Sequence, residues 1–257
     1  MTTPDAHSVT LPLVSIITAT WNAAESIDAC LQSVRNQNYP RLEHLVIDGG
    51  STDATMKIVS AFASPNLRWV SEPDQGIYDA WNKGVALAQG EWIGFLGADD
   101  SYLPGAIAAY MDLAQSDPSA EYLSAQVRWS RPNGTSRIIG KPWDWKLFRH
   151  YMCTAHVGSL HRRSYFDQHG KYDTSLRIVA DYEMLLRAGS GLHAAYMPRI
   201  TATMLSGGAS DSVASIHETA TIKQRSGVLG KTSILVGKWV AMGLHFLQRY
   251  RHRSKAD

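Results

Sequence analysis

The segment "GEWIGFLGADDSYLPG" at residues 90–105 decides the fold prediction, because a short apolar strand in it ends on adjacent carboxylates. The apolar run ends at Leu96, and Asp99 and Asp100 follow within four residues. Two interpretations are open at this point. Aspartates are common at turns and helix N-termini, and Pro104 suits the first turn of a following helix. Alternatively, the acids hold a divalent cation at the carboxyl end of a strand, where open α/β sheets bind ligands.

Upstream of this segment, strand-like runs alternate with amphipathic helix-like runs. Strands are predicted at residues 12–20, 42–50, 67–74 and 91–100, and helices at 23–36, 52–62 and 77–90. The first helix carries one apolar stripe, formed by Ile27, Cys30, Leu31 and Val34. This alternation predicts an α/β fold with a mostly parallel sheet flanked by helices.

After about residue 120 the alternation loosens. A hairpin is predicted around "RPNG" at residues 131–134, a short amphipathic helix at 178–188 and a strand at 192–205. The chain shows no internal repeat and no low-complexity linker. We therefore predict one body followed by a C-terminal tail.

The composition excludes several classes of protein. The 257 residues are 44% hydrophobic and 19% charged, as in ordinary globular proteins. The net charge is only +2, and residues 231–257 carry six Lys and Arg side chains against one acid. The rest of the chain is therefore slightly acidic, which argues against a nucleic-acid binder.

The number of cysteines and the first ten residues indicate the cellular compartment of the protein. Cys30 and Cys153 are too few for a disulfide framework or a metal cluster and favour a reducing environment. The first ten residues lack a signal-peptide pattern, and no apolar run reaches 18 residues. We expect a chain that is not exported and has no membrane-spanning helix.

Three predicted strands end on carboxylates. These are Asp48, the pair Glu72 and Asp74, and the pair Asp99 and Asp100. Parallel strands bring these ends to one edge of the sheet, where crowded negative charge is unfavourable unless a cation or hydrogen-bond donors offset it. A functional site explains the convergence better than turn formation does.

The sequence resembles the family 2 glycosyltransferases, which have the GT-A fold, and especially the bacterial enzymes that build colanic acid and similar exopolysaccharides. The resemblance covers roughly residues 12–210. Four motifs in the usual order carry it, namely "VSIITATWNAAESI", "VIDGGSTDAT", "EPDQGIYDAWNKGVALAQGEWIGFLGADD" and "IVADYEMLLR". Four ordered motifs are specific, whereas each alone would be weak.

The resemblance implies a nucleotide site at the ends of the first two strands. Thr20, Asn22 and Glu25 would hold the nucleotide, and Asp48 would accept a hydrogen bond from the base. The alternative for Asp48 is an Asx-turn before the two glycines that follow it. Many relatives carry a second Asp at the position of Gly49.

The resemblance also implies a metal site in "FLGADD". The family motif is Asp, any residue, Asp, and its first acid falls on Gly97. Asp99 would ligate Mn²⁺ or Mg²⁺, and Asp100 would brace the loop or contact the donor sugar. One carboxylate with a diphosphate is chemically adequate for Mg²⁺. A turn-only role for the pair remains the alternative.

The family's general base is an acid late in the domain, and the matching residue is Asp181 in "VADYE". A single base opposite the leaving group would invert the anomeric carbon. Glu183 is the second candidate for the base. The alternative for Asp181 is that it only caps the helix that begins there.

Other residues are assigned by resemblance with simpler alternatives beside them. Asp74 and Asp79 match donor-side acids, with Asp74 the better match, and Lys83 would lie near the diphosphate or on a solvated helix face. His156 would contact the acceptor or be a structural histidine of the core. Arg163 would contact the acceptor or lie on the surface.

These expectations define an inverting, metal-dependent glycosyltransferase that moves a sugar from a nucleotide-sugar to a polysaccharide or lipid-linked acceptor. Residues 1–230 would form the GT-A-like domain, with a nucleotide-sugar half at 1–120 and an acceptor half at 121–230. Residues 231–257 would form a basic amphipathic helix that either contacts an anionic membrane or packs on the body. The expected location is the cytoplasm, and the membrane-contact alternative for the tail would place the protein at the inner face of the plasma membrane. The rival interpretations are a non-catalytic glycan-binding scaffold and a sugar nucleotidyltransferase.

Overall fold

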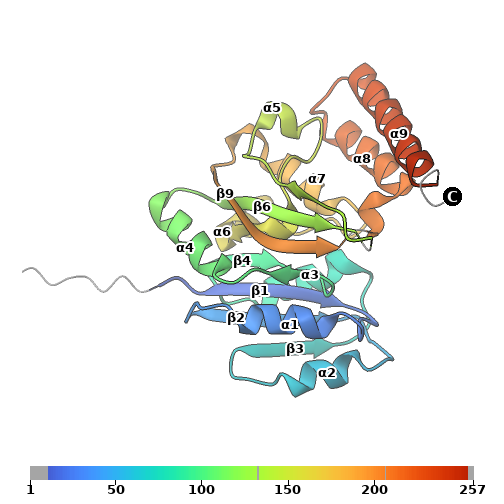
Figure 1. Ribbon diagram of the computed structural model, residues 1–257. Coiled ribbons are helices and arrows are strands. Elements are labelled where there is room, and N and C mark those ends of the chain that lie inside the picture. Colours follow the sequence, from blue (N-terminus) through green and yellow to red (C-terminus); the bar gives the residue numbers. More distant parts are fainter. Residues whose placement is uncertain (1–10, 132, 206, 254–257) are drawn as a thin grey trace, which may run out of the picture.

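Strands from both halves of the chain join in one curved sheet (Figure 1). The computed structural model describes residues 11–131, 133–205 and 207–253. The description leaves out residues 1–10, on which the signal-peptide prediction rests. It also leaves out residues 254–257, the end of the predicted tail. The strands are β1 (Val14–Thr20), β2 (Leu42–Asp48), β3 (Leu67–Ser71), β4 (Trp92–Phe95), β5 (Ser101–Tyr102), β6 (Tyr122–Ser130), β7 (Ser136–Ile139), β8 (Ser159–Arg162) and β9 (Ala194–Leu205).

The sheet order is β3-β2-β1-β4-β8-β6-β9-β5, with β7 paired to β6. The first four of these strands are parallel, as predicted, and the alternating strand and helix segments explain why. Beyond β4 the sheet is mixed, because β8 runs antiparallel to β4 and β6 while β9 runs parallel to β6. The α/β prediction is confirmed, and the hairpin predicted around "RPNG" is the antiparallel pair β6 and β7.

Helices cover both faces of the sheet. They are α1 (Ile27–Arg35), α2 (Thr55–Ala61), α3 (Ile77–Leu87), α4 (Ala106–Ser116), α5 (Trp145–Phe148), α6 (Arg163–His169), α7 (Ala180–Ala188), α8 (Val213–Ser226) and α9 (Lys231–Arg253). Short 3-10 turns lie at His156–Gly158, Gly189–Gly191 and Ala209–Asp211. The predicted helices at residues 23–36, 52–62, 77–90 and 178–188 are present in shortened form, whereas α8 was not predicted.

Alternation along β1 divides the core between the two faces. Ile16 packs with the cluster under α1 and α4, and Ile17 packs with the cluster under α3 and α7. The predicted α1 stripe is buried throughout. Cys30 and Cys153 are buried free thiols, as the cysteine count indicated.

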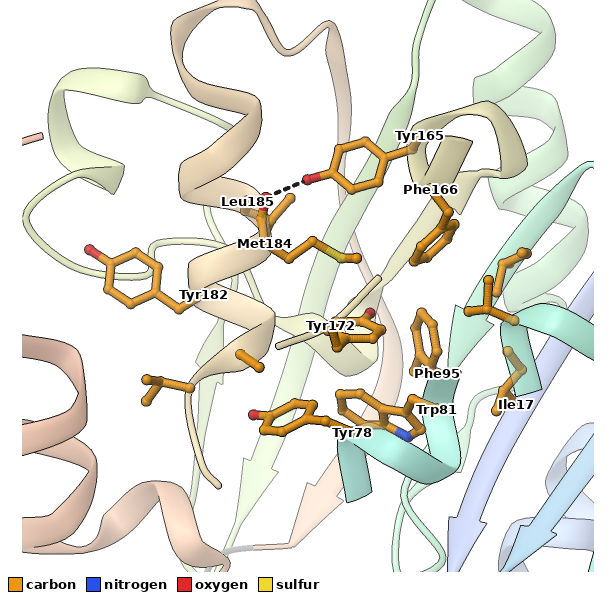
Figure 2. Close-up of a cluster of buried hydrophobic side chains, with 14 of the residues drawn as sticks. Ile17, Tyr78, Trp81, Phe95, Tyr165, Phe166, Tyr172, Tyr182, Met184 and Leu185 are labelled. Carbon is orange, nitrogen blue, oxygen red and sulfur yellow. Dashed lines mark hydrogen bonds between the residues drawn. The ribbon is translucent and has the colours of Figure 1, made fainter. Parts of the chain in front are cut away.

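An aromatic cluster joins the two halves of the chain (Figure 2). Trp81 of α3 lies 4.9 Å from Phe95 and 5.4 Å from Tyr172, measured between ring centroids. On the other side of the cluster, the Tyr165 hydroxyl donates to the Met184 carbonyl of α7 at 2.8 Å. The cluster therefore fixes the start of α7 relative to the parallel strands.

The two C-terminal helices pack against each other at one side of the molecule (Figure 1). No helix in the described ranges is long and apolar enough to cross a membrane.

Candidate active site

The carboxyl ends of the parallel strands gather the predicted site residues. Thr20, Asp48 and Ser71 are register partners across β1, β2 and β3. The strand order reverses between β1 and β4, and ligands of open α/β sheets bind at such a reversal. Asp99 follows β4 at the same edge.

The Asp48 carboxylate is fully buried and belongs to a turn. It accepts hydrogen bonds from the Gly50 and Ser51 amides at 3.2 and 2.9 Å. The Ser51 and Ser71 hydroxyls donate to it at 2.5 and 2.6 Å. These four bonds match the Asx-turn alternative. These bonds take up much of the hydrogen-bonding capacity of the carboxylate, and the contact of Asp48 with a base stays a prediction.

Asn22 connects the loops that follow β1 and β2. It adopts a left-handed conformation with φ of 48°, which asparagine tolerates better than most residues. Its amide donates to the Ser51 hydroxyl at 2.7 Å, and its side-chain carbonyl accepts from the Thr52 amide at 2.9 Å. Beside it, Glu25 is exposed, and the buried Thr20 hydroxyl has no hydrogen-bond partner among the described residues. The rim of the predicted nucleotide site is thus braced from both strands.

Asp74 occupies the space that a side chain at residue 49 would need. A Cβ atom on Gly49 would stand 2.7 Å from Oδ2 of Asp74. The Gly76 amide donates to the other oxygen of Asp74 at 2.8 Å. Glycine at residue 49 therefore leaves room for the Asp74 carboxylate, which lies shortly after the end of β3.

Lys83 of α3 is held by acids from the same edge. Its ammonium lies 2.9 Å from Glu72 and 3.7 Å from Asp79, and it donates to the Pro73 carbonyl at 3.0 Å. The Glu72 interaction, followed by the negative charge of Asp79, raises the pKa of Lys83. The lysine partly neutralises this acidic edge, and a contact with diphosphate stays a prediction.

The Asp99 and Asp100 carboxylates face the same point beside Gly97. A Cβ atom there would meet Asp100 Oδ2 at 2.7 Å and Asp99 Oδ1 at 2.9 Å. Asp99 is exposed, whereas Asp100 is buried and accepts from the Leu205 amide at 3.2 Å. Burial, and then the Asp99 charge, raise the pKa of Asp100 to about 7.

The residues of this pair fit a divalent cation that also binds phosphate. Within residues 11–131, 133–205 and 207–253, no three or more His, Cys, Asp or Glu side chains gather into a protein-only metal site. An open carboxylate beside a second one suits a cation that takes its remaining ligands from phosphate and water. The Leu205 bond to Asp100 agrees with the bracing role predicted for that residue.

Asp181 lies in the first turn of α7, next to the start of α3. The Tyr78 hydroxyl donates to its carboxylate at 3.3 Å. The N-cap of α7 is Val179 and shows no side-chain cap, so capping by Asp181, the alternative considered from sequence, is not seen. Glu183 is paired with Arg187 at 3.0 Å, which leaves Asp181 the more available carboxylate of the two.

Glu218 of α8 is a positioning residue that the sequence analysis missed. Its carboxylate accepts from the amides of Arg177, Ile178 and Val179 at 2.8, 2.7 and 2.9 Å. These amides precede α7, so Glu218 stabilises the positive end of the helix that carries Asp181. Glu218 is 39 to 41 residues away in sequence from the three amides that it binds. No local sequence pattern could therefore have identified it.

The structure separates the two predicted acceptor residues. His156 is buried, its ring stacks on Phe95 at 5.1 Å between centroids, and burial lowers its pKa although the Asp181 charge opposes that shift. Neither ring nitrogen has a hydrogen-bond partner in the described part of the chain. Arg163 donates to the Ala88 and Gly90 carbonyls near the start of β4, at the opposite edge of the sheet. It is therefore not part of this site.

Acids at the carboxyl ends of parallel strands and a further carboxylate from a helix of the second half make up the candidate site. Residues 15–169 match the family model described as "Glycosyl transferase family 2", and the chain belongs to that family. The resemblance inferred from the motifs is thereby confirmed, and the protein is a glycosyltransferase enzyme.

Relatives and solved structures agree. The chain is 36% identical over 193 residues to a "PGL/p-HBAD biosynthesis glycosyltransferase" of Mycobacterium bovis, with 70% of each chain covered. The fold is similar to S. aureus TarS in complex with UDP-GlcNAc, with a TM-score of 0.68, 16% identity, and coverage of 82% of this chain and 66% of TarS. It is also similar to the mannosyltransferase PcManGT of Pyrobaculum calidifontis in complex with GDP-Man and Mn²⁺, with a TM-score of 0.66, 21% identity, and coverage of 87% and 66%.

Proposed function

We propose that the protein is an inverting, metal-dependent glycosyltransferase that transfers a sugar from a nucleotide-sugar to a polysaccharide or lipid-linked acceptor. The observation that carries this proposal is the open Asp99 carboxylate after the end of β4, together with the Asp181 carboxylate of α7, which Tyr78 contacts from the start of α3. The complexes of TarS with UDP-GlcNAc and of PcManGT with GDP-Man and Mn²⁺ support a nucleotide-sugar donor and a divalent cation.

In this proposal Asp99 holds Mn²⁺ or Mg²⁺, and Asp100 supports the loop from its buried position. When bound, the cation would offset the charge of the departing diphosphate. Asn22 and Glu25 line the donor side, with the unpartnered Thr20 hydroxyl beside them. Asp48 accepts a hydrogen bond from the base, and Asp74, which fills the space beside Gly49, lies with it on the donor side.

Asp181 is the proposed base. It accepts the proton of the acceptor hydroxyl while that oxygen forms a bond to the anomeric carbon, and the bond from this carbon to the diphosphate oxygen breaks with the electron pair leaving on the diphosphate. The Tyr78 bond orients the carboxylate, and ordering by Glu218 keeps the first turn of α7 in place. One base on the face opposite the leaving group inverts the anomeric configuration.

We also propose that α9 lies on an anionic membrane surface. Six large apolar side chains project from one face of this helix, each 55–67% exposed: Leu235, Val236, Trp239, Val240, Leu244 and Phe246. The opposite face, which includes Ile234 and Ala241, packs toward the body. Lys231 begins the helix, and the sequence continues into the basic segment "RYRHRSK". An apolar face with basic flanks suits a headgroup interface.

The deciding experiment is isothermal calorimetry with UDP-, GDP- and dTDP-sugars, each with Mn²⁺ and with EDTA. We expect one nucleotide class to bind only with the metal. Asp99→Ala should lose this binding, and Asp112→Ala, which removes an exposed carboxylate from α4, should retain it. Metal-independent binding would contradict the metal role of Asp99. No binding under any condition would favour a non-catalytic glycan-binding scaffold.

A further inference from the structure

A cavity beside Asp181 has no part in the donor site. It measures about 290 Å³ and lies between α7, the loop after α5, and the pair α8 and α9. Its walls are largely apolar, with Met152, Ile178, Ile216 and Ile234 among the lining side chains. A cavity of this size accommodates a small organic group.

Charged groups are placed at separate points of this cavity. Asp181 contributes the only carboxylate among its lining residues, and Lys223 and Lys238 contribute two ammonium groups. Lys223 is buried and donates to the His150 carbonyl at 2.5 Å, which uses one of its three donors. Within the described residues, no acid forms an ion pair with Lys238. Two cations in apolar surroundings favour an anionic ligand.

A second cavity continues the first along α9. It measures about 400 Å³, and Ala220, Ile234 and Lys238 line both cavities. The second cavity extends to Lys231 and Leu235. Leu235 also begins the exposed apolar face of α9. The lining residues of the two adjoining cavities therefore extend from Asp181 to that face, and we call this set of residues the path.

We propose that this path binds a lipid-linked acceptor through its phosphate ester. The acceptor hydroxyl lies at Asp181, the phosphate lies between Lys238 and Lys223, and the hydrocarbon chain leaves along α9 past Leu235. This assignment names the acceptor class and rests on the glycosyltransferase function proposed above. It also gives α9 two roles, because one face lines the acceptor path and the other meets the membrane from which the acceptor comes.

The test uses farnesyl phosphate as a probe, with farnesol and inorganic phosphate as its two halves, measured by calorimetry on the full chain. We expect farnesyl phosphate to bind wild type at least tenfold more tightly than either half. Lys238→Gln should weaken its binding at least tenfold, and Lys57→Gln, on the distant helix α2, should leave it within twofold. Equal binding of inorganic phosphate, equal binding of farnesol, or equal affinity of the two lysine variants would each overturn the proposal.

Two glycines of α9 provide a matched pair that blocks the cavity without charge change. Both glycines are exposed, but only Gly237 lines the cavity, and a Cβ atom on either meets nothing within 4 Å. Gly237→Leu should abolish farnesyl phosphate binding, and Gly243→Leu should preserve it. Both changes remove a glycine from a helix interior and so favour folding. Loss of binding in both variants, or in neither, would contradict the assigned path.

Donor binding is measured on the same preparations. Variants in the acceptor path should bind the nucleotide-sugar as wild type does. Absence of nucleotide-sugar binding in wild type would refute the proposed function, whereas equal farnesyl phosphate affinity across all variants would refute only the acceptor path.

Discussion

At the scale of single residues, the site depends on which carboxylates remain open. Asp48 uses its oxygens on four internal donors, whereas Asp99 is exposed and Asp181 receives one long bond from Tyr78. An enclosed carboxylate shapes a loop, and an open one can bind a cation or accept a proton. Asp99 and Asp181 are therefore the more accessible of these three acids.

Asp181→Asn should separate chemistry from binding. The amide retains the shape of the side chain and cannot accept the acceptor proton, so we expect kcat to fall about 10²- to 10⁴-fold. The affinity for the nucleotide-sugar should remain within twofold, measured by calorimetry. A variant with wild-type kcat would exclude Asp181 as the base and turn attention to Glu183.

At the scale of elements, α7 and α9 place the chemistry. α7 is held by the aromatic cluster on one side and by Glu218 at its N-terminal end. α9 exposes an apolar face that a protein in water would otherwise cover. The contacts of α7 and the exposed face of α9 each lead to a testable prediction.

Glu218→Gln should loosen the start of α7. The amide keeps one neutral acceptor in place of a carboxylate that receives three amide bonds, so we expect the free energy of unfolding to fall by about 2 kcal/mol in urea titrations. The kcat should also fall, with the KM for the nucleotide-sugar unchanged. Asp112→Asn on α4 is the control, and equal behaviour of the two variants would remove Glu218 from its positioning role.

Trp239→Glu should weaken vesicle binding by α9. A charge at the centre of the apolar face disfavours insertion at the headgroup boundary, so we expect at least a tenfold loss of partitioning. The measurement is co-sedimentation with phosphatidylcholine vesicles in which about a third of the lipid is anionic phosphatidylglycerol. Gln115→Glu adds the same charge to the exposed surface of α4 and should bind as wild type. If neither variant changes binding, α9 is not the membrane contact.

At the scale of the whole molecule, buried histidines link stability to pH. Burial lowers the pKa of His44 from 6.5 to about 3 and also lowers the pKa values of His156 and His161. In each case the unfolded chain binds a proton at a pH where the folded chain does not. Their contribution to stability is therefore present above pH 6.5 and declines as the pH falls toward the folded pKa.

His44→Gln isolates one of these contributions. The stability of wild type relative to the variant should fall by about 1.4 kcal/mol per pH unit below pH 6.5, because one proton distinguishes the two unfolded chains. Urea unfolding at pH 7.0, 6.0 and 5.0 measures the difference. The opposite contribution of Asp100, whose pKa is raised, is common to both proteins and cancels. A pH-independent difference would show that His44 titrates equally in both states.

Sequence reasoning predicted the features that depend on local pattern and ordered motifs. Periodicity and spacing predicted the α1 stripe, the parallel strands β1 to β4 and the hairpin. The resemblance of four ordered motifs predicted the family. The free state of the two cysteines followed from their number. These features are encoded by neighbouring residues, so a single sequence contains them.

Other features required contacts between distant segments. The enclosure of Asp48 depends on Ser71, the space beside Gly49 is filled by Asp74, and Arg163 lies at the far edge. Glu218 contacts the start of α7 from α8, a helix that follows a Gly- and Ser-rich segment and was not predicted from the sequence. The sequence by itself determined the fold class, the family and the candidate acids. Only the tertiary structure decided which acids are open and which cavity adjoins Asp181, because solvent access and charge pairing arise when remote side chains meet.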